Sequence, residues 1–115
     1  MKIVLCTAAE APRIAYEDLD GSREGEFYLD PEGIVRFSHP ADGHVWFAAP
    51  DVASFRSAVE CWNKYRGTGS VSGSVAQRAA VDLLRERLST MGLLPDRPDA
   101  LWPILLEQVE EAGLL

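Results

Sequence analysis

The stretch that decides the fold is His44–Tyr65, HVWFAAPDVASFRSAVECWNKY. Its first five residues combine aromatic and β-branched side chains, which fit the pleated surface of a strand. Ala49-Pro50 then ends the strand, because proline cannot donate a ladder hydrogen bond. Asp51 follows as a candidate N-cap, since its carboxylate accepts hydrogen bonds from the free N–H groups of a first helical turn. The stretch therefore predicts a buried strand, a short break and a helix.

An apolar stripe runs along this predicted helix. Phe55, Val59 and Trp62 recur at helical spacing, whereas charged residues occupy another face. Such a stripe usually belongs to a hydrophobic core and only rarely lines a ligand site. We expect the same core role for Trp46 and Phe47 in the strand.

The residues before this stretch predict further strands, so that the sheet occupies mainly residues 2–48. The first strand carries a short apolar run, which is typical of a strand buried on both faces. Asp20-Gly21-Ser22 is a turn signal, and Asp30-Pro31-Glu32-Gly33 has the residue order of a type I turn. We expect these additional strands at Lys2–Thr7, Arg13–Leu19, Gly25–Leu29 and Ile34–Phe37.

Two more helices are expected after the central one, giving helices at about 51–66, 75–91 and 100–112. Ser74-Val75-Ala76-Gln77 is a capping box that starts the second helix, and Gly92 suits the left-handed conformation that ends it. The glycine- and serine-rich segment 67–73 predicts a flexible surface loop. It lacks the lysine of a P-loop and follows a helix, so we exclude a phosphate-binding role.

The whole chain, residues 1–115, is expected to form a single domain, because this length supports one hydrophobic core. The order of elements predicts an α+β fold, with an antiparallel β-meander and about three helices packed on one side. Cys6 and Cys61 lack metal-binding spacing, and we expect two buried free thiols. The sequence shows no signal-peptide pattern and no membrane-spanning run, so we expect a cytoplasmic protein with no membrane partner.

Acidic residues outnumber basic ones, and the net charge is −7. Between Glu17 and Glu32, seven acidic residues stand against Arg23 alone. Such a run most often forms a solvated face, and its alternative role is to steer a basic partner. An acidic domain repels the phosphate backbone, so we expect no nucleic-acid partner. The candidate partner interface consists of Asp18, Asp20, Glu24, Glu26, Asp30, Glu32 and Asp42.

No catalytic, cofactor-binding or metal-binding constellation is evident in the sequence. The motifs of zinc proteases, serine hydrolases, kinases and EF-hands are absent. By spacing, a metal ion could be bound by His39, Asp42 and His44. Spacing alone sets no coordination geometry, however, and solvated histidines are more common. Neither Ser54 nor Ser57 has a histidine in reach by sequence. We therefore expect no enzyme activity, no cofactor and no metal.

Three stretches, taken in order, carry a family resemblance: FYLDPEGIV (Phe27–Val35), VWFA followed by DVASF (Val45–Ala48 and Asp51–Phe55), and WPILLEQV (Trp102–Val109). In this order they resemble the SUKH superfamily, especially its fourth group, in which a Trp-Pro or Trp-x pair opens the last helix. The resemblance extends over residues from about 25 to 113, and its motifs are turns and core positions.

The SUKH resemblance implies an α+β fold and the role of an immunity protein in a bacterial polymorphic toxin system. Such a protein binds a cognate toxin, often a nuclease or deaminase, and blocks it inside the producing cell. No catalytic residue carries over, because the activity is binding, and Phe55, Trp62 and Trp102 match core positions. The expected partner is a toxin domain with a basic surface.

Two other classes of function remain open at the level of sequence. One is a regulatory or scaffold module that binds an endogenous cell protein. The other is a small hydrolase or nucleotide-binding enzyme, which would require a pocket with converging polar side chains.

Overall fold

The computed structural model describes residues 2–41, 43–65 and 75–112, without the side chains of 65, 76, 77, 111 and 112. These ranges contain five strands, a short 3-10 helix and three α-helices. The elements are β1 (Lys2–Leu5), η1 (Ala8–Glu10), β2 (Arg13–Leu19), β3 (Ser22–Leu29), β4 (Val35–Ser38), β5 (Val45–Ala49), α1 (Val52–Tyr65), α2 (Val75–Thr90) and α3 (Leu101–Ala112).

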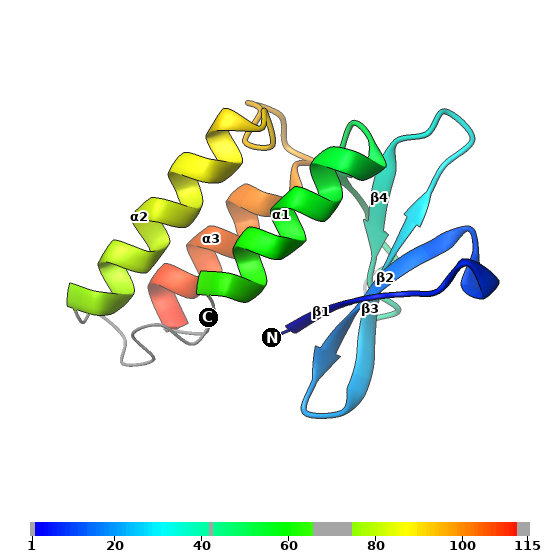
Figure 1. The fold of residues 1–115 in the computed structure, drawn as a ribbon, viewed down its shortest axis with the longest axis horizontal. Helices are drawn as coiled ribbons and strands as arrows, with labels where there is room; N and C mark the ends of the chain where they lie inside the picture. Colours follow the sequence, from blue (N-terminus) through cyan, green and yellow to red (C-terminus); the bar gives the residue numbers. More distant parts are fainter. Residues whose placement is uncertain (1, 42, 66–74, 113–115) are drawn as a thin grey trace.

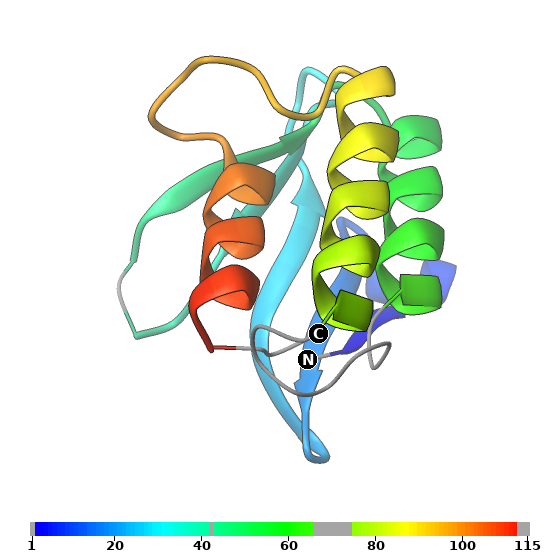
Figure 2. The same cartoon turned by 90° about the vertical axis from the view of Figure 1, so that its left-hand side faces the viewer.

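The five strands form one antiparallel meander in the order β1-β2-β3-β4-β5. The three helices form a second layer against one face of this sheet (Figures 1 and 2). The predicted α+β fold class is thereby confirmed. The prediction that the first strand is buried on both faces is wrong, because β1 is an edge strand. It ends at Leu5, before the expected Thr7, and the Leu5 side chain is 48% exposed.

Tight turns join consecutive strands. Asp20 and Gly21 have φ angles of 52° and 87° between β2 and β3, and the N–H of Gly21 donates to the carboxylate of Asp18. Between β3 and β4, the N–H of Gly33 donates to the carbonyl of Asp30 at 3.0 Å. Both expected reversals are confirmed, and they make β2, β3 and β4 neighbours in the sheet.

Local signals also place the helices. The N–H of Ser54 donates to the carboxylate of Asp51 at 2.7 Å, so Asp51 caps α1 as expected. Gly92 lies after α2 with a φ of 72°, and the N–H of Leu93 donates back to the carbonyl of Leu88. This is the bonding of a Schellman motif. The expected loop 67–73, Ser74 of the capping box, its Gln77 side chain and Gly113 lie outside the described residues.

One hydrophobic core joins the two layers. Its buried side chains come from the sheet and from all three helices. The ring of Phe27 contacts those of Phe37 and Phe55, with centroids 4.7 and 4.8 Å away, and Trp62 lies 6.0 Å from Trp102. The apolar stripe predicted for α1 is thus a core stripe.

The segment that leads into α3 covers the free edge of β5. The N–H of Phe47 donates to the carbonyl of Asp99 at 2.7 Å, and Phe47 and Ala100 form an isolated parallel bridge. The buried indole N–H of Trp102 then donates to the carbonyl of Ala48 at 2.8 Å. These bonds satisfy part of an otherwise exposed strand edge and hold the start of α3 beside β5.

Candidate functional site

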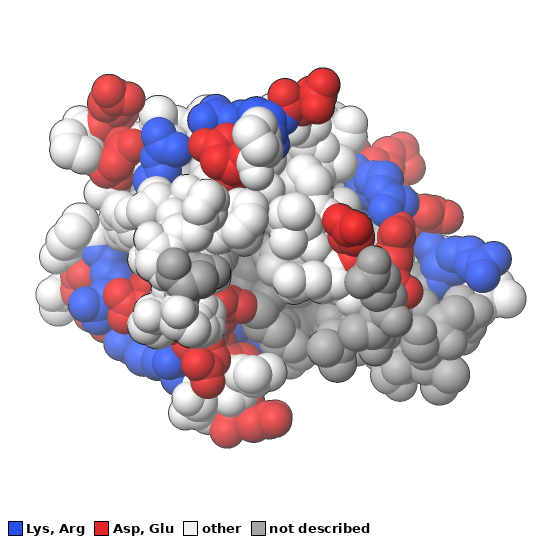
Figure 3. Space-filling model, turned by 180° about the vertical axis from the view of Figure 1, so that it is seen from behind, with Lys and Arg blue, Asp and Glu red and all other residues white. Residues whose placement is uncertain are grey.

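A half-open cavity of about 520 Å³ lies between the sheet and α3. One face of α3 forms its first wall, through Leu101, Ile104, Leu105 and Gln108, which follow one another at helical spacing. Trp62 of α1 closes the cavity beside this wall, and side chains of four strands or their ends form the opposite wall. Figure 3 shows a hollow between the sheet side and the helix side of the molecule.

Three titratable side chains that line this cavity lie near one another and form its polar end: Glu17 from β2, Glu24 from β3 and His39 after β4. Gln108 from α3 also lines the cavity. A register shift between β2 and β3 brings the two glutamates together. Tyr16 pairs with Glu26 and Asp18 pairs with Arg23, so one extra β3 residue lies between these pairs. Such a bulge changes the direction of side chains. Regular alternation would place Glu24 on the same face as Glu26, away from the cavity, but with the bulge Glu24 lines the cavity.

Gly25 makes room for the Glu17 carboxylate. A Cβ atom at Gly25 would overlap the Phe37 ring and the Glu17 carboxylate. The missing side chain therefore allows both groups to lie against the strand, which is a known role of glycine inside strands. The glycine at position 25 of β3 thus leaves room for a carboxylate at the cavity.

The surroundings of Glu17 change its ionisation. Burial raises the pKa of Glu17, because desolvation disfavours the carboxylate, and the nearby charge of Glu24 acts in the same direction. His39 and a hydrogen bond from the Gly25 backbone work to lower the pKa, but the upward shift prevails. Among the described residues, no lysine or arginine forms an ion pair with Glu17.

His39 is tied to the same end of the cavity. Its Nε2 lies 3.8 Å from Oε2 of Glu24, and the other carboxylate oxygen, Oε1, accepts a hydrogen bond from the Ser22 hydroxyl. The Nδ1 of His39 accepts from the N–H of Ala41 at 3.0 Å. Because Nδ1 is an acceptor, the proton of the neutral imidazole is on Nε2, facing Glu24.

Phe47, Phe55 and Trp62 are buried as expected, and Trp46 packs against the core. Trp46 is only partly buried and lines the cavity, while the imidazole of His44 contacts its ring edge to face at 4.3 Å. Trp46 pairs with Phe37 near the end of the sheet where the cavity lies, so no helix side chain fully covers it.

The opposite face of the sheet is not covered by any described helix (Figure 1). Charged side chains on this outer face are paired with one another. Arg13 contacts Glu26 at 2.9 Å. Arg23 binds both carboxylate oxygens of Glu10, at 2.9 and 3.2 Å, and its guanidinium lies 3.8 Å from the ring centre of Tyr16. The outer face is therefore a mixed surface of arginine, carboxylate and tyrosine.

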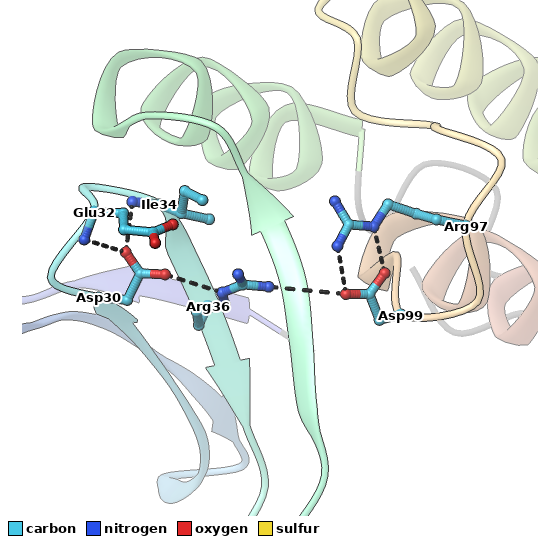
Figure 4. A network of polar contacts seen from close by, with 6 residues as sticks. All are labelled: Asp30, Glu32, Ile34, Arg36, Arg97 and Asp99. Atoms are coloured by element: carbon cyan, nitrogen blue, oxygen red, sulfur yellow. Dashed lines mark hydrogen bonds and ion pairs between the residues drawn. The ribbon is translucent and has the colours of Figure 1, made fainter.

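A second paired network runs from the β3–β4 turn to the segment before α3 (Figure 4). The carboxylate of Asp30 accepts from the N–H groups of Glu32 and Ile34 and from Arg36 Nε. Arg36 also lies 3.8 Å from Asp99, and Asp99 binds the guanidinium of Arg97 with both oxygens.

The network holds two carboxylates in their charged form. Partial burial works to raise the pKa of Asp30, but the hydrogen bonds from Ile34, Arg36 and Glu32 outweigh it and lower the pKa. The Arg97 guanidinium lowers the pKa of Asp99. Arg97 in turn covers the ring of Phe47, at 4.5 Å from its centre.

The seven acids of the predicted interface do not form one patch. Asp18 and Asp20 lie at the β2–β3 turn, whereas Asp30 and Glu32 lie at the other end of β3, roughly 25 Å away for an eight-residue strand. Glu26 belongs to the outer face and Glu24 to the cavity, and Asp42 is outside the described residues.

Sequence reasoning did not single out Glu17, the cavity carboxylate. One signal was present, namely an isolated glycine, Gly25, within a strand pattern, which indicates close approach by another group. What approaches it could not be read from the sequence, because it depends on the β2–β3 register.

Metal binding finds no support among the described residues, which contain no group of three His, Cys, Asp or Glu side chains placed to hold an ion. The expected burial of Cys6 and Cys61 is only half right, since both free thiols are partly exposed. Burial nevertheless raises the pKa of Cys6, and its hydrogen bond to Glu10 adds to this effect. No helix in the described ranges has the length and hydrophobicity needed to cross a membrane.

Comparison of the chain with protein-family models, with curated proteins and with solved structures found no match. The SUKH resemblance therefore stays a prediction. The cavity, with its polar side chains, is the kind of pocket that the hydrolase or nucleotide-binding alternative would require, and that alternative stays untested.

Proposed function

We propose that this chain is a non-catalytic immunity protein of the bacterial cytoplasm, which binds a cognate toxin domain and blocks it by covering its surface. The observation that carries this proposal is the open outer face of the sheet with its paired charges. The toxin as the class of partner rests on the SUKH resemblance of the strand, turn and helix motifs.

The outer face suits protein recognition in composition and in rigidity. Arginine and tyrosine are enriched in the energetically important parts of interfaces, and Arg13, Arg23, Tyr16 and Tyr28 lie on this face. The arginines are already held by Glu26 and by other carboxylates. Binding then orders few additional side chains, and the entropic cost of association is smaller.

Net charge adds a long-range contribution. A net charge of −7 attracts a toxin domain with a basic surface and raises its association rate constant, mainly at low ionic strength. The exposed carboxylates at the two ends of β3, among them Asp20 and Glu32, border the outer face. These carboxylates can attract the basic partner as it approaches, before the paired arginines and carboxylates of the outer face contact it.

The test uses a toxin domain that a gene adjacent to this one encodes, with protection of cells and surface-based binding kinetics as readouts. Glu26→Lys combined with Glu32→Lys should lower the association rate constant by about tenfold at low salt, with a smaller effect at high salt. The matched control is Glu86→Lys with Glu107→Lys, which makes the same charge change on exposed positions of α2 and α3.

Equal slowing by both double variants would show that only net charge matters and would contradict the outer-face interface. Absence of protection by the unaltered chain would contradict the immunity role itself. Stoichiometric binding of a housekeeping protein, without protection from the toxin, would instead support the regulatory or scaffold role.

A further inference from the structure

We propose that the cavity between the sheet and α3 binds a small organic cation, an amine with an apolar body of one or two rings, with Glu17 as the residue that pairs with the ammonium group. This inference goes beyond the proposed immunity function, since it concerns the inner side of the sheet and a different class of ligand.

The size and lining of the cavity fit such a ligand. Small-molecule sites usually enclose about 300–1,000 Å³ and combine apolar walls with a few convergent polar groups. This cavity has about 520 Å³. Flat and branched apolar surface is provided by Trp46, Trp62, Ile104 and Leu105.

The cavity is held open by contacts that fix its walls. The Trp102 hydrogen bond to Ala48 and the Asp99 bond to Phe47 set the position of α3 at its first turn. On the sheet side, Gly25 accommodates the Phe37 ring and the Glu17 carboxylate. A preformed concave space with fixed walls is typical of a small-molecule site.

Charge complementarity selects the class of ligand. Two carboxylates, Glu17 and Glu24, face the polar end, and among the described residues that line it His39 is the only basic one. The second carboxylate repels an anion. An ammonium group next to Glu17 supplies the ion pair that this residue lacks among the described residues, and charge-assisted hydrogen bonds are the stronger ones.

The experiment measures the binding of 4-phenylbutylamine, with 4-phenylbutanol and 4-phenylbutyrate as probes of the same body and different charge. Tryptophan fluorescence and backbone NMR shifts follow the titration, because Trp46 and Trp62 line the cavity. The amine should bind saturably and at least about fivefold more tightly than the alcohol, and the carboxylate should be the weakest ligand.

Three variants locate the site. Glu17→Gln should reduce the amine affinity to that of the alcohol, whereas Glu26→Gln, on the outer face, should leave it unchanged. Ile104→Trp should fill the cavity and abolish binding of both amine and alcohol. Gln108→Lys changes an exposed position of α3, so it should fold normally, and its added cation should abolish amine binding.

Equal affinities of the three probes, or full amine affinity in both Glu17→Gln and Gln108→Lys, would overturn the proposal. It would also be wrong if the toxin domain displaced the amine and Glu17→Gln weakened toxin binding, because a basic side chain of the partner would then be the occupant. Failure of toxin protection leaves the amine titration unaffected, so the two proposals fail separately.

Discussion

At the scale of single residues, Glu17 and Gly25 act as a pair. The absent side chain of Gly25 leaves the space in which the Glu17 carboxylate lies beside Phe37. An aliphatic residue would serve the core better at position 17, because desolvation of a carboxylate costs free energy. A residue type that lowers the stability of the fold is often one that serves function.

The first prediction concerns the pH dependence of stability at Glu17. The pKa of Glu17 is raised in the folded state, so its contribution to the free energy of unfolding depends on pH. This contribution is fully present below the unfolded pKa of about 4.3 and is lost as pH rises through the folded pKa. Glu17→Gln should therefore raise the melting temperature at pH 8 and leave it unchanged near pH 4.

Thermal unfolding followed by circular dichroism across this pH range provides the measurement. Glu26→Gln is the control, since Glu26 is paired with Arg13 on the outer face and should show no gain at high pH. A gain of equal size at both ends of the range would contradict the assignment.

The second prediction concerns Trp102, whose indole N–H reaches the carbonyl of Ala48 in a buried position. Trp102→Phe removes the donor and leaves this carbonyl without that partner, so the free energy of unfolding should fall by about 1–3 kcal/mol. Urea denaturation measures the loss. Trp46→Phe alters a partly exposed ring and should lower the free energy of unfolding clearly less. A similar loss in both variants would show that the loss comes from the smaller ring and not from the missing hydrogen bond.

At the scale of elements, α1 and α3 are positioned by different kinds of contact. A residue next to α1 in the sequence, Asp51, caps its first turn. The start of α3 is instead bound to β5, about fifty residues earlier in the chain, through Phe47 and Ala48. These hydrogen bonds hold the first turn of α3 at the sheet edge, and the cavity extends along the same helix from Leu101 to Val109.

The third prediction tests the cap of α1. Asp51→Ala removes the acceptor for the Ser54 N–H and should lower the melting temperature by roughly 4 °C, whereas Asp51→Asn keeps an acceptor and should cost much less. The hydrogen bond from Ser54 lowers the pKa of Asp51. The contribution of Asp51 to the free energy of unfolding is therefore present above the unfolded pKa and is lost as pH falls through the folded pKa. Equal losses in both variants at pH 7 would contradict a capping role.

At the scale of the whole molecule, the sheet and the helix layer share one core, and neither layer has a separate one among the described residues. The fourth prediction is that both layers unfold together. Far-UV circular dichroism, which follows backbone structure, and tryptophan fluorescence, which follows Trp62 and Trp102 in the core, should give coincident urea transitions. Two separated transitions would show that the sheet survives without the helices.

Charge also acts at this scale. The net charge of −7 describes the chain as a whole, but the outer face of the sheet presents mixed pairs and no uniform acidic surface. Steering by net charge and docking on the paired face are therefore separable, which is why matched charge reversals on α2 and α3 serve as controls.

The sequence by itself determined the features that depend on neighbouring residues. The strand Arg13–Leu19, the reversals at Asp20 and Gly33, the N-cap Asp51 and the glycine end of α2 at Gly92 all agree with the structure. Local backbone preferences and hydrogen bonds within a few residues decide these features, so the pattern of residue types suffices to predict them.

Only the tertiary structure decided where the acids lie and that a cavity exists. The register shift between β2 and β3 separates Glu24 from Glu26, and the bonds from the start of α3 to β5 set the distance between helix and sheet. Both depend on contacts between distant segments, and a one-residue change of register turns a side chain to the other face of a sheet. The acidic run was therefore visible in the sequence, but its division between an outer face and a cavity was not.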